Sequence, residues 1–203
     1  DRNTGEALWY MDVLDADGNV TGRETTNVYD NATDYLCDDP TPLFYGGFGT
    51  SLEFYGFDVS ASFTYSVGGL TYDSGYAGYM TNPSSGGGDN YHKDILNAWT
   101  PENPDSNIPR WQYGDLYPAS TSDRFLVDAS YLNFQNAQIG YTLPQKVTQK
   151  FNVNKLRLYV ACDNIVYWSY RKGLDPRYSF SGSTNNAVNS PIRTISGGVN
   201  ITF

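Results

Sequence analysis

The side chains of this sequence that could do chemistry gather in polar segments rich in turn residues. One of these, DADGNVTGRE, has part of the acidic spacing of an EF-hand loop. With Gly18 as the loop glycine, Asp15, Asp17 and Glu24 occupy the third, fifth and twelfth positions. The first position is Val13, which has no ligand oxygen, and the competing interpretation is a turn whose side chains bond their own backbone. Calcium binding at Asp15–Glu24 is therefore an alternative, and we expect no other metal or cofactor.

A second group combines aromatic rings with short polar side chains in the long segment 68–128. Aromatic faces stack on the C–H faces of sugars, and Tyr and Trp are also enriched in protein interfaces. The same rings could instead pack the segment against itself. The candidate residues for contact with a substrate or with a partner protein are Asp89, Asn90, Tyr91, Trp99, Trp111 and Tyr113.

The sequence offers no recognisable catalytic constellation. The only histidine is His92, a Gly-x-Ser-x-Gly motif is absent, and the acidic pair Asp38–Asp39 has no opposed partner that the sequence can place. Cys37 lies in a turn-rich segment and Cys162 on an apolar strand face, so we expect no disulfide between them and leave the state of Cys37 open. We predict a protein that is not an enzyme.

Composition excludes two broad classes. The chain carries 13 Lys and Arg against 22 Asp and Glu, with a formal charge of −9, so it cannot neutralise a run of phosphates as a nucleic-acid binder does. The mean hydropathy is −0.50, and no apolar run approaches the ~18 residues of a membrane-spanning helix. A strand-based membrane protein remains, because only alternate residues of its strands face lipid.

The elements that must position these residues are strands with alternating polarity. Segments 46–54 and 57–67 each place apolar residues in one phase and polar residues in the other, and a tight turn is expected at Tyr55–Gly56. Segments 129–142, 154–169 and 192–203 have the same pattern. One bulge near Asn136 would bring the apolar residues of its segment onto one face.

The strand and loop lengths favour an outer-membrane barrel. The expected strands exceed the ~5–6 residues of globular sheets and suit a tilted bilayer crossing. Short or moderate links at 55–57 and 143–153 alternate with long loops at 68–128 and 170–191. We therefore predict an all-β chain with an extracellular loop region over 1–43 and antiparallel barrel strands over 44–203, whose long loops at 68–128 and 170–191 are extracellular. Five strands cannot close an ordinary bacterial barrel, so we expect further strands from outside this sequence.

The last strand has a terminal aromatic residue. Val199, Ile201 and Phe203 share one phase, while Asn200 and Thr202 share the other. Terminal strands of this type resemble the signal read by the barrel-assembly machinery. We expect these three residues to act in assembly, and the C-terminus to lie at the periplasmic rim.

Several segments resemble the SusC/RagA family of TonB-dependent outer-membrane transporters. They are, in the family's order, PLFYGGFGTSLEFYGFDVSASFTYSVGG, ILNAWTPENPDSNIPR, SDRFLVDASYLNFQNAQIGYTLP, NKLRLYVACDNIVYWSYRKGLDPR and SPIRTISGGVNITF. The GLDP block at 173–176 and the closing GGVNITF are the most specific. YMDVLDADGNVT also looks like the family's extracellular loop ahead of these strands.

The resemblance implies a 22-stranded barrel of the outer membrane, of which this chain would be the C-terminal portion of about five strands. It implies a separate plug and barrel portion, energy from the TonB complex, a surface lipoprotein lid of the SusD type, and contact with membrane lipid. The cargo would be oligosaccharides, with oligopeptides as the alternative. Two further alternatives are a soluble β-sandwich carbohydrate-binding module and a barrel with a structural or adhesive role.

Overall fold

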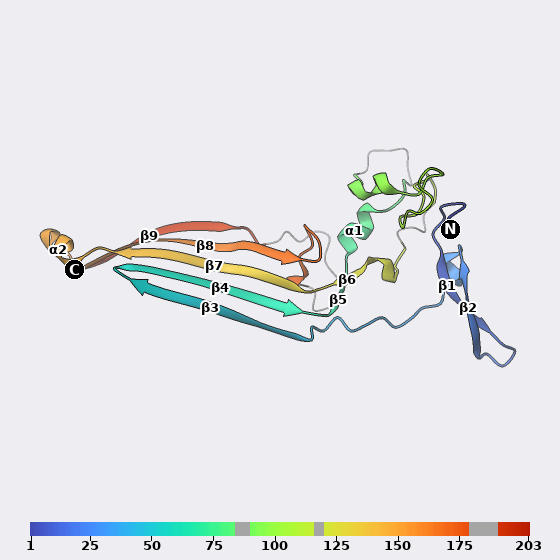
Figure 1. Ribbon diagram of the computed structural model, residues 1–203, viewed down its shortest axis with the longest axis horizontal. Helices are drawn as coiled ribbons and strands as arrows, with labels where there is room; N and C mark the ends of the chain where they lie inside the picture. The colour runs from blue at the N-terminus through green and yellow to red at the C-terminus, as the bar shows by residue number, and fades with distance from the viewer. Residues whose placement is uncertain (84–89, 116–119, 179–190) are drawn as a thin grey trace. The chain divides into compact units, whose positions relative to one another are not determined.

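The computed structural model spans residues 1–203 and describes all of them except 84–89, 116–119 and 179–190 (Figure 1). The chain divides into two compact units. We call Asp1–Asp38 with Tyr72–Leu126 the loop unit, and Asp39–Thr71 with Val127–Phe203 the sheet unit. In the described residues, every helix is too short or too polar to cross a membrane.

The sheet unit contains five long antiparallel strands, in the spatial order β3-β4-β7-β8-β9. Their bounds agree with the predicted segments to within two residues. They are β3 (Phe44–Phe54), β4 (Phe57–Val67), β7 (Tyr131–Thr142), β8 (Lys155–Ser169) and β9 (Thr194–Thr202). The chain thus meanders from one strand to its neighbour, as the alternation of short and long links predicts.

The two shorter links lie at the same end of this sheet (Figure 1). Between β3 and β4, Tyr55 and Gly56 have φ of 48° and 87°, the left-handed pair that a two-residue hairpin with a type I′ turn requires. Between β7 and β8, the chain forms α2 (Gln145–Thr148) and a 3-10 turn at Gln149–Phe151. The C-terminus lies at this end as well.

A bulge in β7 keeps one face of the sheet apolar along its whole length. Phe63 pairs with Phe134 and Ser62 with Asn136, so Gln135 is the extra residue. Strand β8 carries the matching irregularity, because Phe134 faces Val166 while Asn136 faces Asp163. The prediction of a bulge near Asn136 is confirmed.

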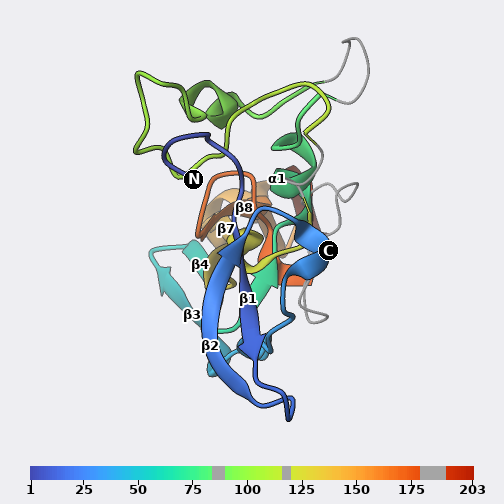
Figure 2. The ribbon, with the colours of Figure 1, turned by 90° about the vertical axis from the view of Figure 1, so that its right-hand side faces the viewer.

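The loop unit begins with a hairpin where the sequence predicts only loop. Strands β1 (Trp9–Leu14) and β2 (Val20–Thr26) pair in antiparallel register, and the acidic segment between them forms the turn (Figure 2). Asp15 Oδ1 accepts hydrogen bonds from the backbone N–H groups of Asp17 (3.0 Å) and Asn19 (2.8 Å). The side-chain oxygens of the turn satisfy backbone donors, which is why a polar run can still close a hairpin.

The rest of the loop unit is a short-element assembly around a small core. It contains α1 (Ser74–Tyr79) and 3-10 helices at Lys93–Asn97 and Asp123–Phe125, the first of them where the sequence predicts a short helix. Strands β5 (Leu70–Tyr72) and β6 (Leu126–Asp128) pair with each other, and each contains the point where the chain passes from one unit to the other. The core consists of Ala77, Met80 and Phe125, with Tyr72, Tyr76, Ile95 and Ile108 packed against it.

Candidate functional site

The two faces of the sheet unit differ in chemistry. One, which we call the apolar face, presents large side chains that stay exposed, such as Phe48 at 56% and Val199 at 56%. Stacked rings run across it, since Phe63 lies between Phe48 and Phe134 with centroid distances of 4.9 and 4.5 Å. An exposed apolar surface of this extent requires lipid or another protein to cover it.

The opposite face, which we call the polar face, carries two paired arginines. Near the short-link end, Arg157 of β8 makes a bidentate pair with Asp58 of β4, and the Nε–Oδ1 distance is 2.9 Å. Gly140 of β7 lies between them, and a Cβ there would meet both charged groups within 2.6 Å. The pair thus ties three strands through a gap that only glycine leaves open.

Near the long-loop end, Arg177 pairs with Asp175 through Nε–Oδ1 and Nη2–Oδ2 distances of 2.7 and 2.5 Å. Both residues belong to the segment that follows β8. Arg177 Nη1 also donates to Asn133 Oδ1 of β7 at 3.1 Å, and its guanidinium lies 4.7 Å from the ring centre of Tyr167 of β8. This pair therefore joins a loop segment to strands rather than one strand to another.

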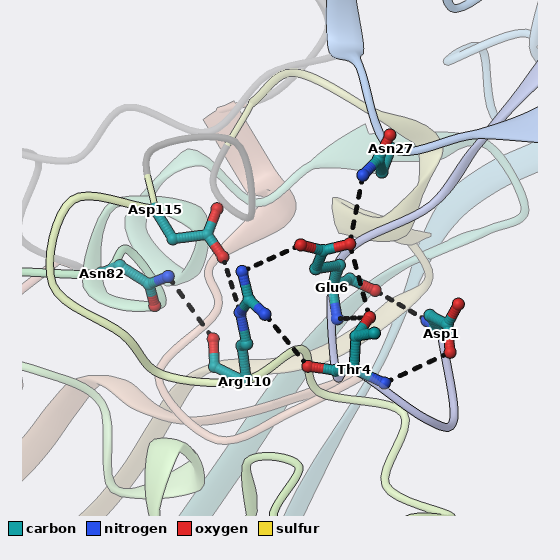
Figure 3. Close-up of polar contacts among 7 residues, drawn as sticks. All are labelled: Asp1, Thr4, Glu6, Asn27, Asn82, Arg110 and Asp115. Atoms are coloured by element: carbon teal, nitrogen blue, oxygen red, sulfur yellow. Dashed lines mark hydrogen bonds and ion pairs between the residues drawn. The ribbon is translucent and has the colours of Figure 1, made fainter.

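The loop unit has its own polar network, centred on Arg110 (Figure 3). Arg110 donates to Glu6 Oε1 (3.0 Å), to Asp115 Oδ2 (3.3 Å) and to the Thr4 carbonyl (3.2 Å). A hydrogen bond from Asn27, 3.1 Å from Glu6 Oε2, is the main cause that lowers the pKa of Glu6, and the neighbouring guanidinium of Arg110 adds to it. The network connects the start of the chain to residues more than a hundred positions away.

Trp99 belongs to the same junction. Its ring packs so closely over Gly5 that a Cβ there would clash with it, and its Nε1 donates to the Arg2 carbonyl at 3.0 Å. Gly5 has φ of +72°, so both the backbone and the ring require glycine there. The predicted candidate Trp99 thus has a packing role in this structure.

The other predicted contact residues have different surroundings. Tyr91 and Trp111 meet edge to face, with ring centroids 5.3 Å apart, and Trp111 is 46% exposed. Tyr113 is 66% exposed and Asn90 is also exposed, while Asp89 lies outside the described residues. Among the candidates that the structure describes, Tyr91 and Trp111 are in ring contact. A role of these residues in binding stays a prediction.

The acidic turn and the two cysteines were the sequence candidates for metal and thiol chemistry. Asp15 lies in the hairpin turn, and Glu24 lies on β2 opposite Met11. Within the part of the chain that the structure describes, no three His, Cys, Asp or Glu side chains gather as a metal site would require. Cys37 and Cys162 are both free thiols, as expected for a pair without a mutual disulfide.

The arginines that organise these sites were not among the residues predicted from the sequence. The GLDP block at 173–176 pointed to the segment before Arg177, but not to its contacts with Asn133 and Tyr167. Nothing in the sequence near Glu6 indicates Arg110 as its partner. The closing residues Val199, Ile201 and Phe203 are exposed, and register pairs Val199 and Ile201 with apolar-face residues of β8.

Comparisons with known proteins agree on one class. The chain is 30% identical over 178 residues to "TonB-dependent receptor P3" of Formosa agariphila, a match that covers 83% of this chain and 17% of the relative. A second TonB-dependent receptor of the same organism is 25% identical over 173 residues, again covering 17% of its length. The chain thus spans about a sixth of the curated relatives it matches. No protein-family profile matches it.

Solved structures of transporters also match the fold of this chain. The structure titled as the RagAB peptide importer in the closed-closed state matches 100% of this chain and 22% of its own chain, with a TM-score of 0.77 and 28% identity. The structure titled as the RagAB peptide transporter matches with a TM-score of 0.76 and 27% identity. These relatives are receptors and importers rather than enzymes.

Proposed function

Because this chain belongs to the SusC/RagA family of TonB-dependent outer-membrane transporters, we propose that it forms a wall of an importer for oligomeric nutrients. In this proposal the apolar face contacts lipid and the polar face borders the lumen. The exposed rings of the apolar face and the paired charges of the polar face support this orientation. In this proposal the two faces belong to one antiparallel sheet that lies in the outer membrane.

We propose oligopeptides as the cargo class. The observation that carries this choice is the match over the whole chain, at 28% identity, to structures titled as a peptide importer. The charge of the loop unit is compatible with it. The loop unit has 16 Asp and Glu against 5 Lys and Arg, a formal charge of −11, which disfavours polyanionic cargo through long-range repulsion.

Oligosaccharides, the cargo predicted first from the sequence, are the second candidate. The exposed rings of Trp111 and Tyr113 support it, since sugars stack on such rings. An uptake assay separates the two candidates: cells with the full-length transporter as sole importer are supplied with a tryptic casein digest or with maltooligosaccharides. Uptake of the digest alone supports the first candidate, and uptake of the sugars alone overturns it.

The proposed partners follow from the family. They are the plug and remaining barrel portion of the transporter, the TonB complex that supplies energy, and a surface lipoprotein of the SusD type. The relatives titled RagAB support the lipoprotein by analogy. Co-purification of the tagged full-length transporter from outer membranes tests it, and recovery of the transporter without a lipoprotein would contradict it.

The terminal strand β9 is proposed to be an assembly signal. Deletion of Phe203 removes one apolar-face side chain at the C-terminus, where its exposure is 82%. We expect the full-length transporter lacking Phe203 to reach the outer membrane at a clearly lower yield, measured as the heat-modifiable folded fraction. Phe203→Tyr keeps an aromatic terminus and serves as the control. Normal yield of the deletion variant would contradict this role.

A further inference from the structure

The chain that leaves β8 turns back over the polar face of the sheet. Gly173 has φ of +95°, and Ser169 Oγ donates to the Leu174 carbonyl at 2.6 Å, which closes the turn. Leu174 is 3% exposed. The segment after the turn, 174–177, is therefore a packed part of the sheet unit rather than a free extension of the strand.

This segment reaches across several strands. Pro176 and Arg177 line a small hollow of about 50 Å³ together with Tyr131 of β7, Ser66 of β4 and Tyr45 of β3. All three strand residues belong to the polar face, as the pairs Tyr45–Ser66 and Ser66–Tyr131 show. The segment thus lies above the polar face from β8 toward the edge strand β3.

One guanidinium joins the segment to the strands beneath it. The side chains of Arg177 and Asp175 are only 12% and 11% exposed, so their two parallel hydrogen bonds are largely shielded from water. Asn133, 5% exposed, accepts from Arg177 and donates to Thr64 Oγ1 of β4 at 3.3 Å. A path of hydrogen bonds therefore runs from the loop segment through β7 to β4, with Tyr167 of β8 stacked beside it.

We propose that Arg177 is a positioning residue, which fixes segment 174–177 over the polar face and makes it a permanent part of the wall that cargo passes. The lumen side of this statement rests on the proposed function. The position of the segment rests on the contacts alone. The planar fork of the guanidinium is needed, because a lysine cannot make the parallel bonds to Asp175 and also bond Asn133 and stack on Tyr167.

A distance measurement between spin labels tests the position without any substrate. The labels are attached at Lys172→Cys and Ser51→Cys of the full-length transporter in which Cys37→Ser and Cys162→Ala remove the native thiols. Both labelled positions are exposed, Lys172 in the turn that leads into segment 174–177 and Ser51 on β3. We expect a narrow distance distribution that widens about twofold in Arg177→Gln, because the ion-pair fork is lost, and an intermediate width in Arg177→Lys.

The matched control is Arg157→Gln at the other end of the polar face. That arginine also makes a bidentate pair with an aspartate, but it joins strands β4 and β8. We expect Arg157→Gln to lower the thermal stability of the barrel and to leave the distance distribution unchanged. An unchanged width in Arg177→Gln, or equal widening in Arg157→Gln, would overturn the proposal. If Arg177→Gln fails to assemble, the width in Arg177→Lys decides.

Uptake of a tryptic casein digest gives a second readout. We expect the half-saturating concentration to rise in Arg177→Gln while the maximal rate per folded transporter stays near wild type. Arg157→Gln, corrected for its folded amount, should change neither. An equal loss of both parameters in the two variants would contradict a positioning role. If the wild type takes up no peptide, the proposed cargo fails while the distance result still decides the position of the segment.

Discussion

The contacts inside the sheet unit differ in kind from the contacts inside the loop unit. In the sheet unit, neighbours along the chain become neighbours in space, and one apolar face runs through all five strands. In the loop unit, a few side chains connect segments that are far apart in sequence, as Arg110 connects to Glu6. Strand pairing repeated along five strands stabilises the sheet unit, whereas individual side-chain contacts stabilise the loop unit.

The two units also differ in charge. The sheet unit has 8 Lys and Arg against 6 Asp and Glu, a formal charge of +2, while the loop unit carries −11. The few cationic side chains of the loop unit therefore have many potential acidic partners, and Arg110 pairs with two of these, Glu6 and Asp115. We expect a change in the sheet unit to act according to its face, and a change in the loop unit to act according to the individual contact it removes.

The largest effect is expected at Phe63 on the apolar face. Phe63→Arg removes a ring stacked between two others and places a charge toward lipid, at a cost of about 2–4 kcal/mol if the position lies near the bilayer midplane. Ser62→Arg is the control on the adjacent polar-face position and should cost much less. Urea titration of the purified full-length transporter, folded into lipid vesicles, measures both. Equal costs would contradict the assignment of the faces.

Period-two alternation is why the sheet could be predicted from sequence. Segment 57–67 places Phe57, Val59, Phe63 and Tyr65 in one phase, and the structure keeps them on one face. Even the bulge followed from the pattern, because the phase of apolar residues changes between Phe134 and Ala137. The prediction needed only local residues, since each strand pairs with its sequence neighbour.

The next largest effect is expected at Gly5. Gly5→Ala combines a positive φ with a clash against the Trp99 ring, and we expect a cost of about 2–3 kcal/mol. Gly18→Ala is the matched control, because Gly18 has φ of +84° but a Cβ added there would meet no atom within 4 Å. Gly18→Ala should cost only the strain of a positive φ at a residue with a Cβ, about 1 kcal/mol.

Hydrogen exchange of residues 1–8 and 104–112 in the full-length transporter reports the Gly5 site, and exchange of 9–26 reports the hairpin. An equal loss of protection in the two variants would show that the ring contact adds nothing.

The loop unit shows what the sequence could not supply. Turn residues around Asp15 predicted a turn, but the strands β1 and β2 on either side have too little alternation to indicate a hairpin. Trp99 appeared as a candidate for substrate contact, because a sequence does not reveal that Gly5 lies beneath its ring. The Arg177 contacts were missed for the same reason, since Asn133 and Tyr167 reach it only through the fold.

A smaller effect is expected from breaking the Arg110 network. Arg110→Gln leaves Glu6 and Asp115 without their guanidinium, and we expect a loss of about 1–2 kcal/mol in the same exchange measurement. Arg2→Gln provides the control, because the Arg2–Asp105 pair has a similar length of 3.1 Å but is 80% and 75% exposed. Exposed pairs contribute little, so this variant should change protection by less than about 0.5 kcal/mol. Similar losses would mean that burial does not distinguish the two pairs.

The smallest expected effect is the pH dependence that Glu6 gives to the loop unit. Its pKa lies below the ordinary 4.5 because Asn27 and Arg110 favour the ionised carboxylate, so its contribution to stability is present above pH 4.5 and is lost as the pH falls through the lowered pKa. We therefore expect protection of residues 1–8 and 104–112, corrected for the intrinsic exchange rate, to weaken as the pH falls below 4.5.

Glu6→Gln keeps the shape of the side chain but cannot titrate. Protection of the same residues in this variant should be lower at neutral pH and should change less with acid. Asp15→Asn provides a contrast within the same unit, because the pKa of Asp15 is lowered mainly by its backbone bond from Asn19, and its titration should affect the hairpin rather than the Arg110 network. If acid weakens protection at the network equally in wild type and Glu6→Gln, the Arg110 junction is sensitive to other carboxylates and Glu6 is not its titrating member.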